Sequence, residues 1–118
     1  MQTVVETPSY LRQAKVVGMT DDEMKAAVDL VAANPEAGDR IVGSGGCRKL
    51  RLAGKGKGKS GGYRIITWHG GDTIPVFLLW VLSKGSDANL TDAQVIALSA
   101  ATRALKAGAD GVRTGGKP

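Results

Sequence analysis

Acidic residues are missing from one long stretch of this sequence. Between Arg40 and Gly71 there is no Asp or Glu. The same stretch holds half of the sixteen Lys and Arg residues, namely Arg40, Arg48, Lys49, Arg51, Lys55, Lys57, Lys59 and Arg64. The remainder carries all eleven acidic residues, so the net charge of +5 originates in this stretch alone. A positive field concentrated on one segment predicts a polyanion as partner.

The sequence also has few cysteines, few aromatic residues and no long apolar run, and each of these shortages argues against a class of protein. A single cysteine, Cys47, excludes a disulfide within the chain and a zinc cluster built on cysteines. Aromatic residues make up only 4% of the chain, which argues against a base-stacking platform. The longest apolar run, Val76–Leu82, is too short to cross a bilayer, and the N-terminus lacks the pattern of a secretory signal. We expect a cytoplasmic protein without a membrane partner.

Helix signals dominate the N-terminal third. Residues 3–5 are β-prone, and Thr7 followed by Pro8 is typical of a helix N-cap and first helical position. Thr20–Glu23 has the spacing of a capping box and predicts a second helix. That helix must end before Pro35, because proline disfavours a helical residue in front of it.

Strands dominate the middle of the chain. Alternating or continuous apolar residues predict three strands, over Arg48–Leu52, Tyr63–Trp68 and Val76–Leu82. A second capping box, Thr91–Gln94, opens a C-terminal helix. The fold class is α+β, with the order β-α-α-β-β-β, an antiparallel-rich sheet packed against two N-terminal helices, and a C-terminal helix. We expect one domain over residues 1–107 and a flexible glycine-rich tail over residues 108–118.

The turn near residues 71–73 indicates how the last two strands pair. If they are antiparallel, paired residue numbers sum to roughly 144, so Arg64 lies near Trp80. The pairing predicts that five basic residues converge at one end of the sheet: Lys55, Lys57, Lys59, Arg64 and Lys84. The only histidine, His69, is then expected at the other end.

Such a cluster suits phosphodiester chemistry on RNA, whose 2′-hydroxyl is a built-in nucleophile. The forked, permanently charged guanidinium of Arg64 matches a phosphorane, and crowded lysines lower one another's pKa toward the range of a general base or acid. This chemistry requires no metal. The same lysines can also simply bind backbone phosphates, and the residues alone slightly favour binding without chemistry.

Several segments, taken together and in order, resemble the HigB branch of the RelE/ParE toxin superfamily. They are Ala33–Asp39, Gly43–Gly46, Arg48–Arg51, Gly54–Arg64, Leu78–Lys84 and Asn89–Thr91. The resemblance extends over nearly the whole chain, from Val4 to Leu105.

The resemblance implies a RelE-like fold and a toxin of a type II toxin–antitoxin system. Such a toxin cleaves mRNA in the ribosomal A site without a metal or another cofactor, and thereby inhibits translation. Its cognate antitoxin is expected to be a helix-turn-helix DNA-binding protein. The catalytic residues implied are Lys55, Lys57, Arg64 and Lys84. The RNA-binding residues expected beside them are Arg48, Lys49, Arg51, Lys59, Tyr63 and Trp68.

One position departs from the family pattern. Relatives often have a tyrosine where this chain has Leu82, so a ring that stacks on a base is replaced by an aliphatic side chain. Either Trp68 or Tyr63 supplies the stacking, or the chain is a non-catalytic relative that binds RNA or the ribosome. A third alternative is a ParE-like inhibitor of DNA gyrase. The clustered cations favour the nuclease, since a gyrase inhibitor does not need them.

Overall fold

The computed structural model describes residues 2–53, 62–83 and 90–115. Its elements are β1 (Val4–Glu6), α1 (Pro8–Val16), α2 (Asp21–Ala33), β2 (Asp39–Arg40), β3 (Arg48–Ala53), β4 (Gly62–His69), β5 (Val76–Ser83) and α3 (Asp92–Gly115). The predicted α+β class and element order are confirmed. The short strand β2 is an addition that the turn-rich sequence around it did not indicate.

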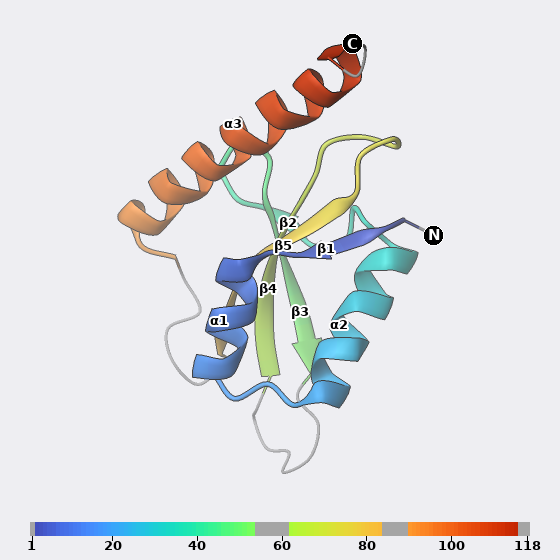
Figure 1. Cartoon of the computed structure of the whole chain (residues 1–118). Coiled ribbons are helices and arrows are strands. Elements are labelled where there is room, and N and C mark those ends of the chain that lie inside the picture. Colours follow the sequence, from blue (N-terminus) through green and yellow to red (C-terminus); the bar gives the residue numbers. More distant parts are fainter. Residues whose placement is uncertain (1, 54–61, 84–89, 116–118) are drawn as a thin grey trace.

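The strands form one sheet in the order β1-β5-β4-β3-β2. β1 is parallel to β5, and the remaining neighbours are antiparallel. Helices α1 and α2 pack on one face of this sheet, and α3 crosses the other face obliquely (Figure 1). No helix among the described residues is both long enough and apolar enough to cross a membrane.

Local capping signals determine where the helices begin. The Thr7 side chain accepts a hydrogen bond from the Tyr10 amide, with Pro8 in the first turn of α1. At α2 both halves of the capping box form, because Thr20 Oγ1 accepts from the Glu23 amide and Glu23 Oε1 accepts from the Thr20 amide. The same exchange between Thr91 and Gln94 precedes α3.

The register between β4 and β5 differs from the prediction. Arg64 pairs with Leu82, not with Trp80, so residue numbers at this end of the ladder sum to 146. The reason is a β-bulge. Ile66 pairs with Trp80 while Thr67 pairs with Leu78, which leaves Leu79 as an extra residue in β5. The predicted separation of Arg64 and His69 is confirmed, since His69 pairs with Val76 beside the turn.

Each face of the sheet has its own hydrophobic core. The face under α1 and α2 buries Leu50, Ile65 and Val81 together with Tyr10 and Val31. On the other face, α3 places Leu98 against four buried residues of the strands and the preceding loop, namely Cys47, Ile66, Trp68 and Leu79. Successive side chains of the central strands therefore point into one core and then the other. A shift of one residue would place each of them on the wrong face, so the register is strongly fixed.

Helix α3 is attached to a glycine-rich loop. Thr102 Oγ1 donates to the Ser44 carbonyl over 3.1 Å, and Ser44 is fully buried. A β-carbon at Gly45 would collide with Thr102 Oγ1, so only glycine allows this close approach. The helix then continues to Gly115, so the tail expected from residue 108 is helical at its start. The helical pattern extends past Gly108 and Gly111, although each glycine inside a helix costs about 1 kcal/mol.

A hydrogen bond from Tyr63 connects the sheet to α2, and its removal tests the fold. The Tyr63 hydroxyl donates to Glu23 Oε1 over 2.9 Å, and both residues are buried. Burial and this bond raise the pKa of Tyr63. Tyr63→Phe removes a donor from a buried carboxylate, so we expect the free energy of unfolding to fall by about 1–3 kcal/mol in urea denaturation.

Tyr10→Phe is the matched control for that change. Tyr10 is fully buried, but the hydrogen-bond partner of its hydroxyl among the described residues is the Met19 sulfur, at 3.8 Å. Because a thioether is a weak acceptor, the loss should stay within about 0.5 kcal/mol. Equal losses for the two variants would contradict a specific role for the Tyr63–Glu23 bond.

Candidate nucleic-acid interface

Among the described residues, three cations and one acid line an open cavity on the sheet face turned away from α1 and α2. The cavity has a volume of about 390 Å³, and we call it the basic pocket. Its lining consists of Gly38, Asp39, Lys49, Leu50, Arg51 and Arg64. No residue of the described part of α3 belongs to this lining, so the helix leaves this part of the sheet accessible.

The two arginines of the basic pocket are direct neighbours. Arg51 and Arg64 are paired residues of the antiparallel β3–β4 ladder, so their side chains leave the sheet on the same face. Like charges directly opposite each other destabilise a sheet. Within the described residues, Arg64 Nη1 is buried and has no hydrogen-bond partner. An anion between the two guanidinium groups would relieve both costs.

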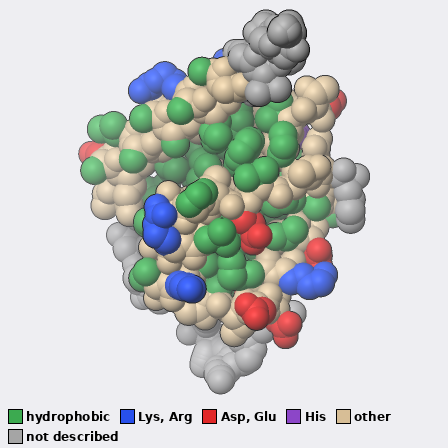
Figure 2. Space-filling model, viewed as in Figure 1, with side chains coloured by type: hydrophobic (Ala, Val, Ile, Leu, Met, Phe, Trp, Pro, Cys, Tyr) green, Lys and Arg blue, Asp and Glu red, His purple; other side chains and the backbone are tan. Residues whose placement is uncertain are grey.

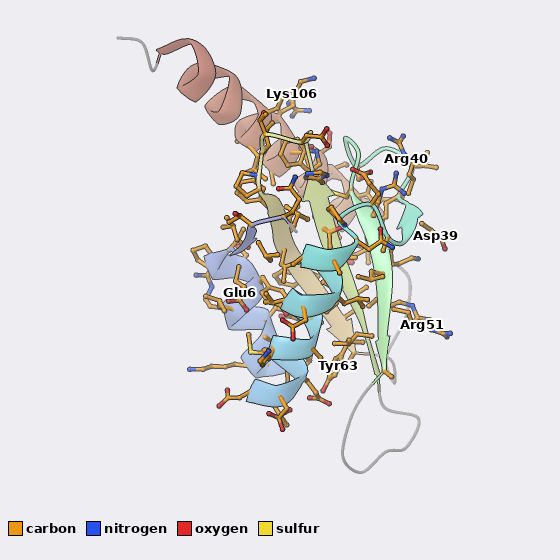
Figure 3. The ribbon with its side chains drawn as sticks, turned by 90° about the vertical axis from the view of Figure 1, so that its right-hand side faces the viewer. Glu6, Asp39, Arg40, Arg51, Tyr63 and Lys106 are labelled. Atoms are coloured by element: carbon orange, nitrogen blue, oxygen red, sulfur yellow. The ribbon has the colours of Figure 1, made fainter. Side chains whose placement is uncertain are left out.

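Strand β2 forms the wall of the basic pocket. Asp39 pairs with Lys49 across the β2–β3 ladder. Gly38 makes this approach possible: its φ is +100°, and a β-carbon there would lie 2.6 Å from the Lys49 carbonyl oxygen. Figure 3 shows Asp39 and Arg51 projecting from the strands on the side away from α2. Sequence reasoning missed Asp39 as a site residue, because a two-residue strand has too short a pattern to recognise.

A second polar cluster lies on the other face of the same strands. Glu36 Oε2 accepts from His69 Nδ1 over 2.7 Å, and Glu36 Oε1 lies 3.4 Å from Arg48 Nη2. Arg48 Nη1 also donates to the Gly38 carbonyl oxygen over 3.0 Å. The hydrogen bond from His69, with the charges of His69, Arg48 and Arg40, lowers the pKa of Glu36. Arg48, expected to contact RNA, therefore holds the loop before β2 in place.

The aromatic residues expected at the interface lie in the two cores. Tyr63 faces α2 and is bonded to Glu23. Trp68 is only 6% exposed, and its ring centroid lies 5.9 Å from that of Phe77. A buried ring cannot stack on an incoming base without leaving its core. Both side chains are therefore held in the cores and do not replace the missing tyrosine at the interface.

Four of the predicted lysines, Lys55, Lys57, Lys59 and Lys84, lie outside the described residues. The described strands nevertheless end close to one another. Ala53 pairs with Gly62 on either side of the lysine-rich segment, and Tyr63 pairs with Ser83, the residue before Lys84. The four paired residues Ala53, Gly62, Tyr63 and Ser83 lie at the Arg64 end of the sheet.

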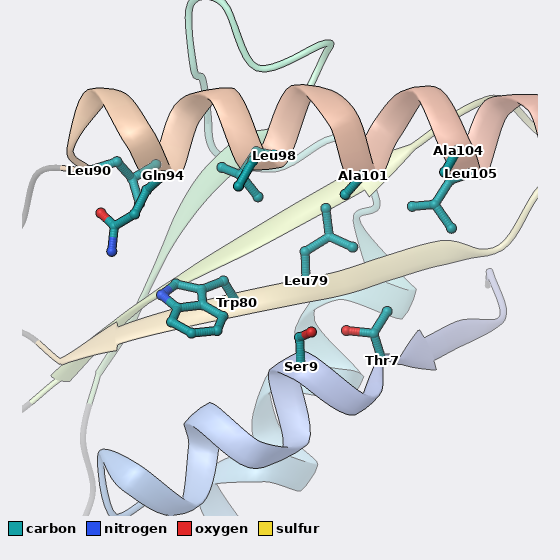
Figure 4. Close-up of a pocket in the computed structure, with 11 residues that line it drawn as sticks. Thr7, Ser9, Leu79, Trp80, Leu90, Gln94, Leu98, Ala101, Ala104 and Leu105 are labelled. Atoms are coloured by element: carbon teal, nitrogen blue, oxygen red, sulfur yellow. The ribbon is translucent and has the colours of Figure 1, made fainter.

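A larger cavity of about 490 Å³ lies elsewhere and is mostly apolar (Figure 4). Lined by α3, β5 and the start of α1, this apolar groove includes both Leu79 and Trp80, which the bulge brings to one face. Hydrophobic side chains gather between α3 and α1 in Figure 2. Because none of its lining residues in the described part of the chain is charged, the apolar groove does not suit a nucleic-acid backbone.

A cysteine nucleophile and a metal site both find little support among the described residues. Burial raises the pKa of the Cys47 thiol to about 11, so this cysteine is protonated at neutral pH and is a poor nucleophile. Within residues 2–53, 62–83 and 90–115, no three His, Cys, Asp or Glu side chains form a group that could hold a metal ion.

Comparisons with known proteins agree with this fold. Residues 2–112 match the family model described as the RelE toxin of the RelE/RelB toxin–antitoxin system. A solved structure of an E. coli RelE toxin mutant in the free state superposes with a TM-score of 0.54. The two chains are 19% identical, and the match covers 86% of this chain and 96% of that one. At this identity the superposition supports the fold alone.

The different positions of Arg48 and Arg51 generate a prediction about polyanion binding. Arg51→Ala removes a cation from the basic pocket, so it should weaken binding of a short single-stranded RNA and reduce the salt dependence by about one phosphate contact. Arg48→Ala removes an equal charge from the Glu36 cluster and should leave the RNA affinity nearly unchanged. Fluorescence anisotropy at several salt concentrations measures both. Equal losses for the two variants would show that net charge, not the basic pocket, determines binding.

Proposed function

The chain belongs to the RelE toxin family, and from this premise we propose that it is a metal-independent endoribonuclease that cleaves mRNA in the ribosomal A site. A toxin of this family has an antitoxin as its partner, and we propose that here the antitoxin is a helix-turn-helix DNA-binding protein. The observation that carries the nuclease proposal is the pair Arg51 and Arg64, with a buried Arg64 nitrogen that has no partner within the described residues.

The proposed chemistry follows from what RNA brings to the site. Its 2′-hydroxyl attacks the adjacent phosphate, the phosphorane gains charge, and the 5′-oxygen leaves. The Arg64 guanidinium offers two parallel N–H groups to the phosphorane oxygens, and Arg51 beside it adds a second fixed charge. We assign removal of the 2′-hydroxyl proton and protonation of the 5′-oxygen to Lys55, Lys57 and Lys84, which follow the strand ends nearest to Arg64.

The family departure at Leu82 lies inside the proposed site. Leu82 pairs with Arg64 across the β4–β5 ladder, so its side chain leaves the sheet on the same face. Leu82 is buried, with 9% of its surface exposed, but the longer side chain of a tyrosine at this position would extend beyond it and place a ring beside the phosphate-binding arginine. Leucine offers no stacking surface, which favours slower cleavage than in relatives with the ring.

A binding protein without nuclease activity is the second candidate. Its support is the same leucine, because the basic pocket can bind phosphates whether or not a base is stacked beside it. Gyrase inhibition is a weaker alternative, since protein contact with gyrase gives no reason for two adjacent arginines in an open pocket. The two alternatives differ from the nuclease in leaving mRNA intact.

The test is the mapping of mRNA 5′ ends in translating cells after brief induction of the protein. Wild type should create new ends inside coding frames, and these should vanish when translation is blocked. Arg64→Ala should reduce them at least 100-fold, because it removes a fixed charge from the transition state. Arg64→Lys should recover only part of the loss, since lysine lacks the fork.

Lys25→Ala is the control of equal charge for this experiment. Lys25 is an exposed residue of α2, on the other face of the sheet, and pairs only with Asp29 within the described residues. Its cleavage pattern should match that of wild type. Intact mRNA with arrested growth would move the function to ribosome binding or gyrase inhibition, which an in vitro supercoiling assay then separates.

Leu82→Tyr should increase cleavage. A ring at this position can stack on a base next to the phosphate that Arg64 binds, and such stacking would raise the cleavage rate by roughly tenfold. Leu82→Met conserves the side-chain volume without adding a ring, so its rate should equal that of wild type. A rate measured in a reconstituted translation system that does not rise, in a Leu82→Tyr variant of unchanged thermal stability, would exclude stacking at this position.

A further inference from the structure

The basic pocket contains one residue that phosphate binding does not explain. Asp39 carries a negative charge in a pocket whose other charged residues are Lys49, Arg51 and Arg64. It is exposed, and among the described residues it makes no ion pair and no side-chain hydrogen bond that would give it a structural task. A carboxylate beside a phosphate site repels the phosphate, so its presence calls for a different ligand group.

The position of Asp39 is fixed relative to the two arginines. Asp39 pairs with Lys49, and Lys49 lies two residues before Arg51 on the same strand, so all three side chains share one face. Lys49 is therefore one two-residue step along β3 from Arg51, at about 7 Å, and Asp39 and Arg64 lie on the neighbouring strands on either side of β3. The close packing of Gly38 against the Lys49 carbonyl holds β2 in this place.

An acceptor beside a donor is a pattern that distinguishes the four bases. The Watson–Crick edge of guanine presents two adjacent N–H donors, at N1 and N2, next to the O6 acceptor. A carboxylate can accept from both donors at once, while an ammonium donates to O6. Adenine, cytosine and uracil each place an acceptor where one of the two donors must be.

We propose that Asp39 and Lys49 form a guanine-reading subsite, in which the Asp39 carboxylate accepts from N1–H and N2–H and Lys49 donates to O6, beside the phosphate held by Arg51 and Arg64. The inference rests on the proposed function in that the ligand is a single-stranded RNA. It adds a base preference to that function and assigns the residue that determines it. Bases of single-stranded RNA are read on this edge because it is free of a pairing partner.

The experiment uses the full chain and five short RNAs that differ at one central nucleotide, which is guanine, inosine, adenine, cytosine or uracil. All five carry 2′-O-methyl groups, so that cleavage cannot occur, and affinities are measured by fluorescence anisotropy at one salt concentration. Wild type should bind the guanine RNA about tenfold more tightly than the adenine, cytosine and uracil RNAs. Inosine, which lacks the N2 amino group, should fall between.

Asp39→Asn should change the preference in a characteristic way. An amide presents one acceptor and one donor, which matches adenine, so the guanine preference should disappear and adenine should gain. The affinity for the adenine, cytosine and uracil RNAs should rise, because a negative charge is removed from the pocket, whereas the guanine RNA loses a hydrogen bond and should not gain. Asp72→Asn is the control of equal charge change at the other end of the sheet, where Asp72 lies in the turn before β5, and it should keep the guanine preference.

The outcomes separate this inference from the nuclease proposal. Equal affinities of wild type for all five RNAs, or an unchanged guanine preference in Asp39→Asn, would overturn the guanine subsite even if mRNA is cleaved in cells. A guanine preference that Asp39→Asn abolishes would support the subsite even if no cleavage is found. Absence of binding to all five RNAs would overturn the guanine subsite, whereas the nuclease proposal is decided by the 5′-end mapping in translating cells.

Discussion

The pairing of Arg51 with Arg64 is the constraint on which the rest of the interface depends. Two guanidinium groups at this spacing repel each other, and no acidic residue of β3 or β4 relieves them. The opposite face of the same strands holds them together. Leu50 and Ile65 are buried beneath α1 and α2, and a register slip of one residue would turn them out to solvent. Burial of apolar surface on one face thus stabilises a concentration of charge on the other.

Helix α3 decides how much of the charged face stays open. Its buried residue Leu98 and the Thr102–Ser44 bond attach it over the half of the sheet that contains Ile66 and Leu79. The basic pocket begins where this cover ends, and none of its described lining comes from α3. The bulge at Leu79 contributes as well, because it adds a second apolar side chain under the helix without shifting the Arg51–Arg64 pair.

Local signals made most of the fold predictable, whereas the site depended on contacts that a sequence does not reveal. Both N-terminal helices begin where their caps indicated, because a cap needs only residues three positions apart. The β4–β5 register was wrong by two, because a bulge has no sequence signature of its own. The sequence placed Tyr63 at the RNA site, because nothing in it indicates the hydrogen bond to Glu23, which is forty residues away along the chain. Trp68 was open to either assignment until the packing of Phe77 and α3 around it was known.

The two acidic residues that precede the basic stretch illustrate how strand alternation divides structural from binding roles. Glu36 and Arg48 meet on the face of the helices, where an ion pair and a bond to Gly38 secure the loop. Asp39 lies three residues after Glu36, and Lys49 directly follows Arg48. Both project from the opposite face into the basic pocket. Phosphate contacts position a nucleic acid, and base contacts give it a sequence. Lys49 lies about 7 Å along β3 from Arg51 and has Asp39 beside it, so one nucleotide can reach from the arginine pair to Asp39 and Lys49. The same short loop that Glu36 secures can thus convert a general anion site into one that selects a base.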